Sequence, residues 1–381
     1  MHLSRYLPLA AALLGIGLST PAHATDYPLV VTDLAGRNVE IKAEPQRIVV
    51  QDGRDLFTLA VLDREDPFKR IVAWNNILAR SDPDSFAAFA ARWPESSARP
   101  IDMKFGDEGQ VNLEQVAATK PDLLIFQVRT RQALDDADLF DRLAGLGIPI
   151  VLVDTELEPT KNSPKTVDLL GRVLNREAEA KAFNTFYAER LALVRQRIEG
   201  APKKPLVFIE AKAGQKGPDS CCFTHGDVYF GKLVAEAGGE NLGSRLVKGR
   251  TGDVATETLI DAKPDVLLMS GSKFSNDGSI SPPIGIAADR GRIEASLKVL
   301  SGRKGFQFIK AVEDDRVYGL YHQLYASPWN VYAIEFMAKA FYPDRFADLD
   351  PEADLRTLVD RFTGLPKDLP LVFGAKAPLA D

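Results

Sequence analysis

Basic and aromatic side chains gather where the predicted strands of this chain end, and together they could bind an anionic, flat ligand. Arginine and lysine neutralise carboxylate or catecholate oxygens, and aromatic rings pack against an apolar body. A single loop arginine often forms only a surface salt bridge, and a single ring often belongs to the core. As a group, the residues predicted to contact a ligand are Arg54, Trp74, Arg129, Arg131, Lys273, Tyr321, His322, Tyr325 and Trp329.

Histidine and cysteine offer further chemistry in the second half of the chain. His225 and His322 fall in predicted loops, and neutral imidazole is a common iron ligand, although a lone loop histidine is more often a hydrogen-bonding surface residue. Cys221 and Cys222 are adjacent, so they could form a turn-locking disulfide, remain two thiols, or offer two soft metal ligands. Because zinc normally needs four ligands and only His225 is near, we favour the disulfide or thiol pair and expect no metal site.

Signatures of catalysis and of dinucleotide binding are missing from the sequence. Gly-x-Ser-x-Gly, His-Glu-x-x-His and Gly-x-Gly-x-x-Gly do not occur. The four histidines, two of them in the first 24 residues, leave little material for acid–base chemistry. We therefore expect no catalytic residue and no cofactor, with an exported enzyme or redox protein that uses Cys221 and Cys222 as the alternative.

The N-terminal segment 1–24 has the pattern of a signal peptide. A cationic start at Arg5 precedes an apolar run from Leu7 to Leu18 and the small-residue site Ala22-His23-Ala24. This run is shorter than the roughly 20 residues that a membrane-spanning helix needs. We predict cleavage after Ala24 and a periplasmic protein, with an uncleaved membrane anchor as the alternative. Because no cysteine lies at the cleavage site, we do not expect a lipid anchor.

Composition and length narrow the class of protein. The 381 residues carry a formal net charge of −6, and 45% of them are hydrophobic. Acidic residues scattered along the chain, without long basic runs, argue against nucleic acid as a partner. A single hydrophobic core stops growing near roughly 250–300 residues, so two lobes fit this length.

A repeated pattern supports two similar lobes. Residues 111–124 (VNLEQVAATKPDLL) match residues 254–267 (VATETLIDAKPDVL), with identical Val, Glu, Lys, Pro, Asp and Leu. Each copy predicts a short helix, a turn at Lys-Pro-Asp and a buried strand. A period this long indicates duplicated α/β units rather than a short solenoid repeat.

The order of elements predicts an α/β protein with two Rossmann-like lobes and a ligand cleft between them. Strands alternate with helices in residues 25–175 and again in residues 201–381, which is typical of parallel sheets. The longest helical pattern, 176–200, would be a single rigid helix that joins the two lobes. Ligands of such sheets lie beyond the carboxyl ends of the strands. This rule selects the loops 51–55, 74–76, 127–131, 212–225, 270–276 and 321–329.

The repeat, together with Ala237-Gly238-Gly239-Glu240-Asn241 and Ser327-Pro328-Trp329, resembles the periplasmic binding proteins for ferric siderophores, haem and vitamin B12. The resemblance covers nearly all of the chain after residue 24. It implies two lobes joined by one long helix and an ABC importer whose inner-membrane permease is the partner. It also implies that Glu114 and Glu257, one in each copy of the repeat, dock onto arginines of that permease.

From the resemblance and the loop chemistry we predict a monomer that captures a ferric-siderophore-type iron complex. Haem ranks second because Tyr321 and His322 are neighbours, and a corrinoid ranks third. Both glutamates fall in the first turn of a short helix, where the alternative role is to complement the helix dipole. A sensory or adhesive module with the same lobes and no permease is a further alternative.

Overall fold

The first lobe of this computed structural model is built on a parallel sheet. The structure describes residues 25–105, 111–274 and 278–378, so the predicted signal peptide 1–24 lies outside it. Within those ranges the strand order is β5-β4-β3-β6-β7, and every pair is parallel. The strands are β3 (Ile48–Val50), β4 (Ile71–Trp74), β5 (Ile101–Asp102), β6 (Leu123–Gln127) and β7 (Ile150–Val153).

Helices cover both faces of this sheet, and a short hairpin lies beside it. The hairpin pairs β1 (Leu29–Thr32) with β2 (Asn38–Ile41). The helices are α1 (Leu56–Leu62), α2 (Ile77–Ser81), α3 (Pro83–Arg92), α4 (Pro94–Ser97), α5 (Leu113–Ala118), α6 (Arg131–Asp136), α7 (Leu139–Ala144) and α8 (Pro159–Val173). All five residues of β6 are buried, as expected for a strand covered on both faces.

The second lobe repeats this plan with one change. Its main sheet has the order β10-β8-β12-β14-β16 in the described part of the chain, and only β16 runs antiparallel to its neighbour. These strands are β8 (Leu206–Glu210), β10 (Glu240–Asn241), β12 (Val266–Gly271), β14 (Val317–Tyr321) and β16 (Gly374–Lys376). Two small antiparallel pairs flank the sheet, namely β9 (Phe223–His225) with β11 (Thr251–Asp253), and β13 (Gly285–Ile286) with β15 (Leu371–Val372).

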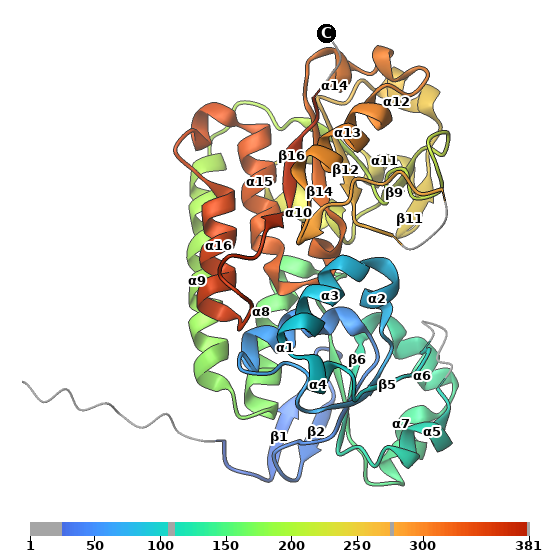
Figure 1. Cartoon of the computed structure of the whole chain (residues 1–381), viewed down its shortest axis with the longest axis vertical. Helices are drawn as coiled ribbons and strands as arrows, with labels where there is room; N and C mark the ends of the chain where they lie inside the picture. The colour runs from blue at the N-terminus through green and yellow to red at the C-terminus, as the bar shows by residue number, and fades with distance from the viewer. Residues whose placement is uncertain (1–24, 106–110, 275–277, 379–381) are drawn as a thin grey trace, which may run out of the picture.

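Seven α-helices accompany the second lobe in the described residues. They are α10 (Phe230–Glu236), α11 (Gly243–Leu246), α12 (Thr256–Ala262), α13 (Arg290–Ser301), α14 (Lys310–Glu313), α15 (Val331–Phe341) and α16 (Pro351–Phe362). The fold class is therefore α/β with two lobes, and Figure 1 shows them one above the other.

One long helix, α9 (Glu177–Ile198), runs along the side of both lobes (Figure 1). At about 1.5 Å per residue its 22 residues span roughly 33 Å. Its buried face packs against α8 below and α15 above. Phe183 and Phe186 contact Phe362 at the end of α16, so the C-terminal helix also reaches the first-lobe side.

The duplicated sequence has the same structure in both lobes. Each copy is a helix, α5 or α12, followed by a central strand, β6 or β12. Lys120 and Lys263 end these helices with left-handed backbones, at φ of 47° and 50°. Asp122 and Asp265 then accept hydrogen bonds from the backbone N–H groups that lead into β3 and β8. The Lys-Pro-Asp turn therefore anchors each repeat strand to its neighbour in the sheet.

The lobes also contact each other directly. Phe57 on α1 lies edge-on to Tyr321 and Trp329 of the second lobe, with ring centroids 6.4 and 4.9 Å apart. A single cluster of buried apolar side chains continues through these rings from one lobe to the other. The lobes are thus held by α9, by this aromatic contact and by polar contacts described below.

Candidate functional site

A cleft of about 840 Å³ lies between the two lobes, at the carboxyl ends of their strands. The first lobe lines it with the turns that follow β3, β4 and β6, and the second lobe with those that follow β8, β12 and β14. This is the place where open α/β sheets bind ligands. The lining residues are Asp52, Arg54, Asn75, Ile77, Arg80, Ser81, Phe105, Arg129, Lys212, Gln215, Lys216, Phe274, His322, Gln323 and Tyr325.

The first-lobe side of the cleft contains a closed ring of four charged groups. Arg54 Nη2 lies 2.5 Å from Asp52 Oδ2 and 2.7 Å from Glu156 Oε1. Arg129 bridges the same two carboxylates, at 2.6 Å to Asp52 and 2.7 Å to Glu156. Arg54 also donates a hydrogen bond to the hydroxyl of Tyr325 in the other lobe. In this ring of described residues, two positive charges are thus balanced by two negative ones.

Burial and mutual charge set the protonation of this ring. Burial alone would raise the pKa of Asp52, but the charges of Arg54 and Arg129 outweigh it and hold that pKa below its usual value. The neighbouring Asp55 accepts hydrogen bonds from Gln127 Nε2. Burial, with the negative charge of Asp52, raises the pKa of Asp55 to about 8.

Aromatic rings form the second-lobe wall. The ring of Tyr325 lies within 5.1–5.5 Å of the rings of His225, Tyr229, Phe230 and His322. His322 lines the cleft, and its Nδ1 lies 2.9 Å from Ser270 Oγ. Burial, with the positive charge of Lys212, lowers the pKa of His225 to about 3, and the same causes lower that of His322. Both imidazoles are therefore neutral at physiological pH.

Four of the residues predicted to contact a ligand line this cleft together: Arg54, Arg129, His322 and Tyr325. They come from turns that are far apart in sequence, and the parallel sheets bring them to one place. The prediction that they touch ligand stays a prediction.

The structure places three predicted aromatic residues elsewhere. Trp74, Tyr321 and Trp329 are 0–1% exposed and do not line the cleft. Trp74 packs against Phe68 in the first lobe, at 5.8 Å between ring centroids. Tyr321 and Trp329 form the contact between the lobes through Phe57. A large ring at the end of a strand can turn back into the core, and the sequence signal for a loop does not exclude this.

Two predicted cations also lie outside the lining. Arg131 is on the surface, where it donates to the backbone oxygen of Ala35 and pairs with Asp135. Lys273 pairs with Asp84 across the lobe boundary at 2.7 Å. Both are satisfied by carboxylates close to them, which is the ordinary role of a loop cation.

Several residues that line the cleft are not among those predicted from the sequence to contact a ligand. The missed polar residues all fall in loops that the strand-end rule selects: Asp52, Asn75, Lys212, Gln215, Lys216 and Gln323. Reading every polar residue of those loops would have found them. Other lining residues, Ile77, Arg80, Ser81 and Phe105, lie on α2 and next to β5, elements that the sequence pattern did not indicate.

A disulfide bond joins Cys221 and Cys222 just before β9. Glu210 lies close enough to form a three-residue metal cluster with them. Both oxygens of Glu210, however, bind Arg303, and the two sulfurs bind each other. The donor atoms of this cluster are thus already used, and the pair does not line the cleft.

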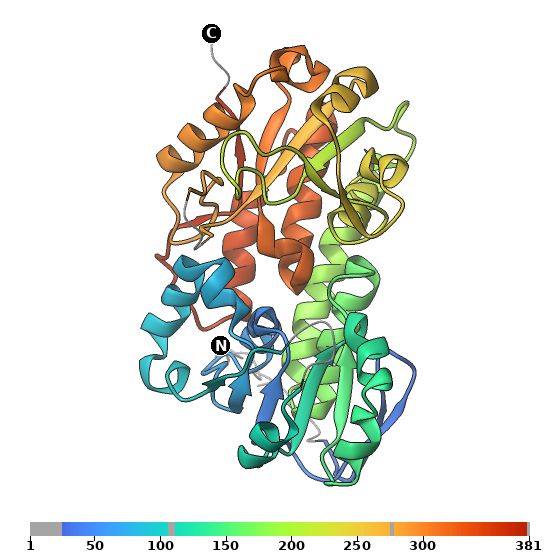
Figure 2. The ribbon, with the colours of Figure 1, turned by 90° about the vertical axis from the view of Figure 1, so that its right-hand side faces the viewer.

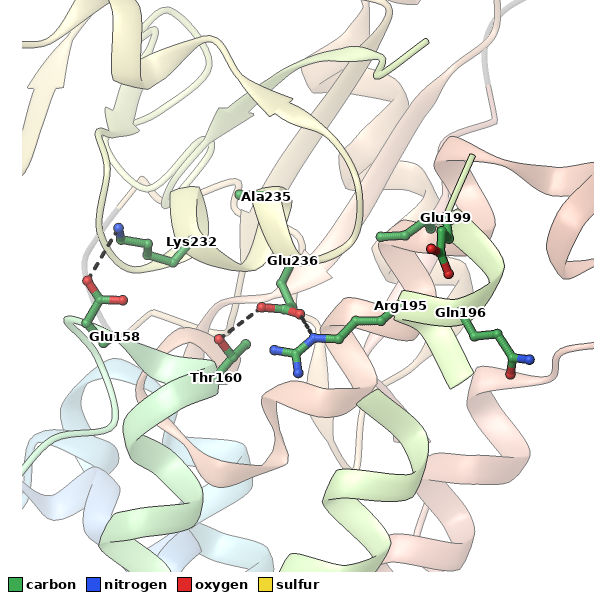
Figure 3. Close-up of a pocket in the computed structure, with 9 residues that line it drawn as sticks. Glu158, Thr160, Arg195, Gln196, Glu199, Lys232, Ala235 and Glu236 are labelled. Carbon is green, nitrogen blue, oxygen red and sulfur yellow. Dashed lines mark hydrogen bonds and ion pairs between the residues drawn. The ribbon is translucent and has the colours of Figure 1, made fainter. Parts of the chain in front are cut away.

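A second groove, of about 590 Å³, lies where α8, α9 and α10 meet (Figure 3). Its charged groups largely pair with one another. Lys232 Nζ is 3.3 Å from Glu158, and Glu236 binds both Arg195 and Thr160. Because α8 belongs to the first lobe and α10 to the second, these contacts tie the lobes together. Among the charged lining residues that the structure describes, only the exposed Glu199 has no salt bridge.

The two repeated glutamates lie on one side of the molecule. Glu114 and Glu257 are exposed residues in the first turns of α5 and α12. Figure 1 places both helices on the side away from α9, and this side faces the viewer in Figure 2. Among the described residues, neither carboxylate takes part in a salt bridge or a side-chain hydrogen bond.

Comparison with known proteins identifies the family. The model of the periplasmic binding protein family matches residues 84–324. This chain belongs to the periplasmic binding protein family. The match includes the cleft residues from Phe105 to His322 and both copies of the repeat, so it rests on both lobes.

Individual relatives agree with this assignment for the periplasmic binding protein. It is similar to a TroA-like periplasmic binding protein named FepB from Veillonella parvula, at 27% identity over 92% of this chain and 100% of that chain, with a TM-score of 0.83. The substrate-binding lipoprotein YvrC of Bacillus subtilis is 22% identical over 89% of this chain and 96% of its own length. The molybdate-binding protein MolA of Haemophilus influenzae is 22% identical over 93% and 97%.

The matched relatives are named as binding proteins rather than as enzymes. The periplasmic binding protein described here is therefore a substrate-binding component of the ABC-transporter type. Across the described residues, the structure contains no helix with the length and apolar character that crossing a membrane would require.

Proposed function

We propose that this chain is a periplasmic, monomeric binding protein that captures a ferric-siderophore-type iron complex between its lobes. The observation that carries the proposal is the cleft itself, which is lined by five cationic side chains and one carboxylate among the described residues. Even with Glu156 counted against Arg54 and Arg129, the positive charges outnumber the negative ones. Such a site attracts an anionic ligand.

The size of the cleft favours a chelate over a simple oxyanion. About 840 Å³ falls within the roughly 300–1,000 Å³ that holds a drug-sized ligand. A single oxyanion such as molybdate, which the relative MolA is named for, would leave most of this space to water. The rings of Phe105, Phe274 and Tyr325 supply apolar surface for the organic part of a chelator.

Delivery would use the exposed glutamates of the two repeats. Glu114 and Glu257 lie on one side of the molecule, one on each lobe, without a protein partner among the described residues. A carboxylate held by an arginine fork is a directional contact. A permease with two such arginine sites would bind best when the distance between Glu114 and Glu257 matches the distance between its own two sites.

Haem is the second candidate ligand. His322 is neutral and lines the cleft beside Phe274 and Tyr325, so an imidazole and aromatic rings meet in one place. Haem iron is commonly held by histidine or tyrosine. No comparable group of described residues favours a corrinoid. The alternative of an enzyme that uses Cys221 and Cys222 is not favoured either, because the bonded pair is not among the lining residues of the cleft.

A ligand panel tests the proposed function. Purified protein is titrated with ferric siderophores of different charge, haemin, cobalamin and molybdate, with binding followed by calorimetry and native mass spectrometry. We expect one or more ferric siderophores to bind at submicromolar concentration with one complex per chain. Tighter binding of haemin, with a Soret shift that His322→Ala abolishes, would transfer the assignment to haem. Tighter binding of molybdate would remove the iron-chelate proposal.

A further inference from the structure

The cations of the cleft differ in whether the protein already neutralises them. Arg54 and Arg129 share Asp52 and Glu156, and Arg80 pairs with Asp102 at 2.9 Å. Lys212 has no salt bridge or side-chain hydrogen bond among the described residues, and the same holds for the exposed Lys216. The positive charge that the cleft can offer to a ligand therefore comes from the second-lobe loop after β8.

Lys212 is held in place by its backbone. Its N–H donates to Ser270 Oγ at 3.1 Å, and the next residue, Ala213, donates to the backbone oxygen of Ser270 at 2.9 Å. Its φ of 56° lies in the left-handed region, which is uncommon for a residue with a side chain and usually persists only where the surroundings enforce it. The position of the side chain is thus built into the loop.

The surroundings of the ammonium group would stabilise an anion. Lys212 is half-buried and faces Arg54 and Lys216, two further positive charges. Burial, followed by these charges, lowers its pKa from the usual value. On its other sides lie the neutral rings of His225 and His322 and the face of Phe223, whose centroid is 5.9 Å from Nζ. None of these groups balances its charge.

A partly dehydrated cation without a counter-charge is costly, and a protein commonly supplies a partner for it. In the described part of the lining the one carboxylate, Asp52, pairs with the two arginines and not with Lys212, and the ammonium group remains reachable from the cleft. We infer that Lys212 binds a negatively charged oxygen of the ligand, of the carboxylate or catecholate class, and thereby selects anionic over uncharged chelates. The two arginines instead organise the floor of the cleft.

This inference deepens the proposed function and depends on it for the site of binding. Two probes of similar size separate charge from shape: the trianionic ferric complex of a hexadentate tris-catechol chelator, and the uncharged ferric complex of a hexadentate tris-hydroxamate chelator. The variants are Lys212→Gln, Lys212→Arg and, as the matched control, Lys216→Gln on the same loop.

We expect Lys212→Gln to weaken binding of the tris-catechol complex by about 10- to 100-fold, the size of a lost charge-assisted hydrogen bond. Binding of the tris-hydroxamate complex should change by less than about threefold. Lys212→Arg should keep most of the affinity, and Lys216→Gln should have little effect because its charge is exposed to solvent. Without ligand, the melting temperature of Lys212→Gln should stay equal to that of the wild type or rise.

Other results would overturn the inference. An equal loss for both complexes, or a lower melting temperature without ligand, would assign Lys212 to packing rather than to charge recognition. If the wild type binds the uncharged complex and not the trianionic one, Lys212 does not read charge, although an iron-chelate carrier remains. If neither ferric complex binds, the proposed function fails and takes this inference with it.

Discussion

Charge balance at single residues decides how the floor of the cleft is stabilised. Asp52 and Glu156 are 3–4% exposed at their side chains and hold Arg54 and Arg129 between them. Each arginine forms a salt bridge with each carboxylate. When one partner of a buried ion pair is removed, the remaining charge is left poorly compensated. The stability of the protein should therefore be sensitive to substitution of any one of these four residues. This holds even though neutral residues of similar size would cost less free energy to bury.

The variant Glu156→Gln tests this at the residue scale. Among the described residues it leaves Asp52 as the one carboxylate that pairs with both guanidinium groups, so we expect the free energy of unfolding at neutral pH to fall by about 3 kcal/mol. Denaturation in urea measures it. The matched control is Glu352→Gln, which breaks the exposed pair with Arg290, with side chains 46% and 52% exposed. That change should cost at most about 1 kcal/mol. Equal losses in both variants would mean that the buried ring contributes nothing special.

The strand-end rule predicts from the sequence which loops border the site, but not which way each side chain in those loops points. Arg54, Arg129, His322 and Tyr325 follow strand ends and face the cleft, because parallel strands bring their carboxyl ends together. Trp329 follows the same rule but packs into the core, and no local pattern tells the direction of a ring. The strand-end rule selects the loop of Lys212 but does not single out this lysine, because the role inferred for it depends on how its charge pairs with residues far away in the sequence.

The start of α3, with the end of α2 before it, is the element that closes one side of the cleft. Ser81 accepts a hydrogen bond at its backbone oxygen from Ser272 Oγ at 3.0 Å, and its own Oγ accepts one from Gln323 Nε2 at 3.2 Å. Tyr321 donates to Asp82, and the backbone N–H of Ile286 donates to Ser85 Oγ at 3.2 Å. A short segment of the first lobe thus makes repeated polar contacts with the second, and we call residues 81–85 the seam.

The seam should give the protein a specific pH dependence through Asp82. Burial, opposed by the hydrogen bonds of Ser85 and Tyr321 and assisted by the charge of Asp84, raises the pKa of Asp82 to about 6. A raised pKa means that the folded state holds this proton more tightly than the unfolded state. The contribution of Asp82 to stability is therefore full below about pH 4 and is lost as the pH rises through about 6, by about 2–3 kcal/mol.

Asp82→Asn removes this titration and keeps an oxygen for Tyr321 and for the cap of α3. Relative to the wild type, its free energy of unfolding should be similar near pH 4 and higher near pH 7, as measured by urea denaturation across this range. Asp84→Asn, two residues away, breaks the exposed pair with Lys273 and removes a minor contribution to the raised pKa of Asp82, so it should be neutral or slightly destabilising at pH 7. A pH-independent difference for Asp82→Asn would show that its charge is not the cause.

Element boundaries show what periodicity in the sequence leaves out. Residues 132–144 read as one helix, but the structure has α6 and α7, separated at Asp138 by a left-handed backbone with φ of 51°. The sequence pattern does not indicate the helix α8, because Pro164 stands inside it and proline normally interrupts a helix. In contrast, α9 is expected at 176–200 and is found at 177–198, because a long alanine-rich stretch without proline or glycine runs up to Gly200 and favours one continuous helix.

At the scale of the whole molecule, the duplication places one short helix in the same way relative to the sheet of each lobe. In both lobes the Lys-Pro-Asp turn joins a short helix to a central strand. The helices α5 and α12 therefore have equivalent positions relative to β6 and β12. The helix α9, the seam and the contacts of α8 with α10 limit how far the lobes can separate. If ligand binding moves the lobes relative to each other, the distance between α5 and α12 should therefore change by only a small amount.

If that distance is what the permease recognises, reversing both exposed charges should block transport and leave capture intact. We expect Glu114→Arg combined with Glu257→Arg to reduce uptake of the bound ligand to background in cells that carry the variant in place of the chromosomal copy, because arginine would face arginine at both sites. Calorimetry on the purified variant should give the wild-type ligand affinity, since neither residue lines the cleft. The control, Glu189→Arg with Glu199→Arg, makes the same change in net charge on exposed positions of the α9 side and should transport normally. Normal uptake by the first variant would remove the docking role of the glutamates, whereas equal loss in both variants would point to net charge rather than to the repeat helices.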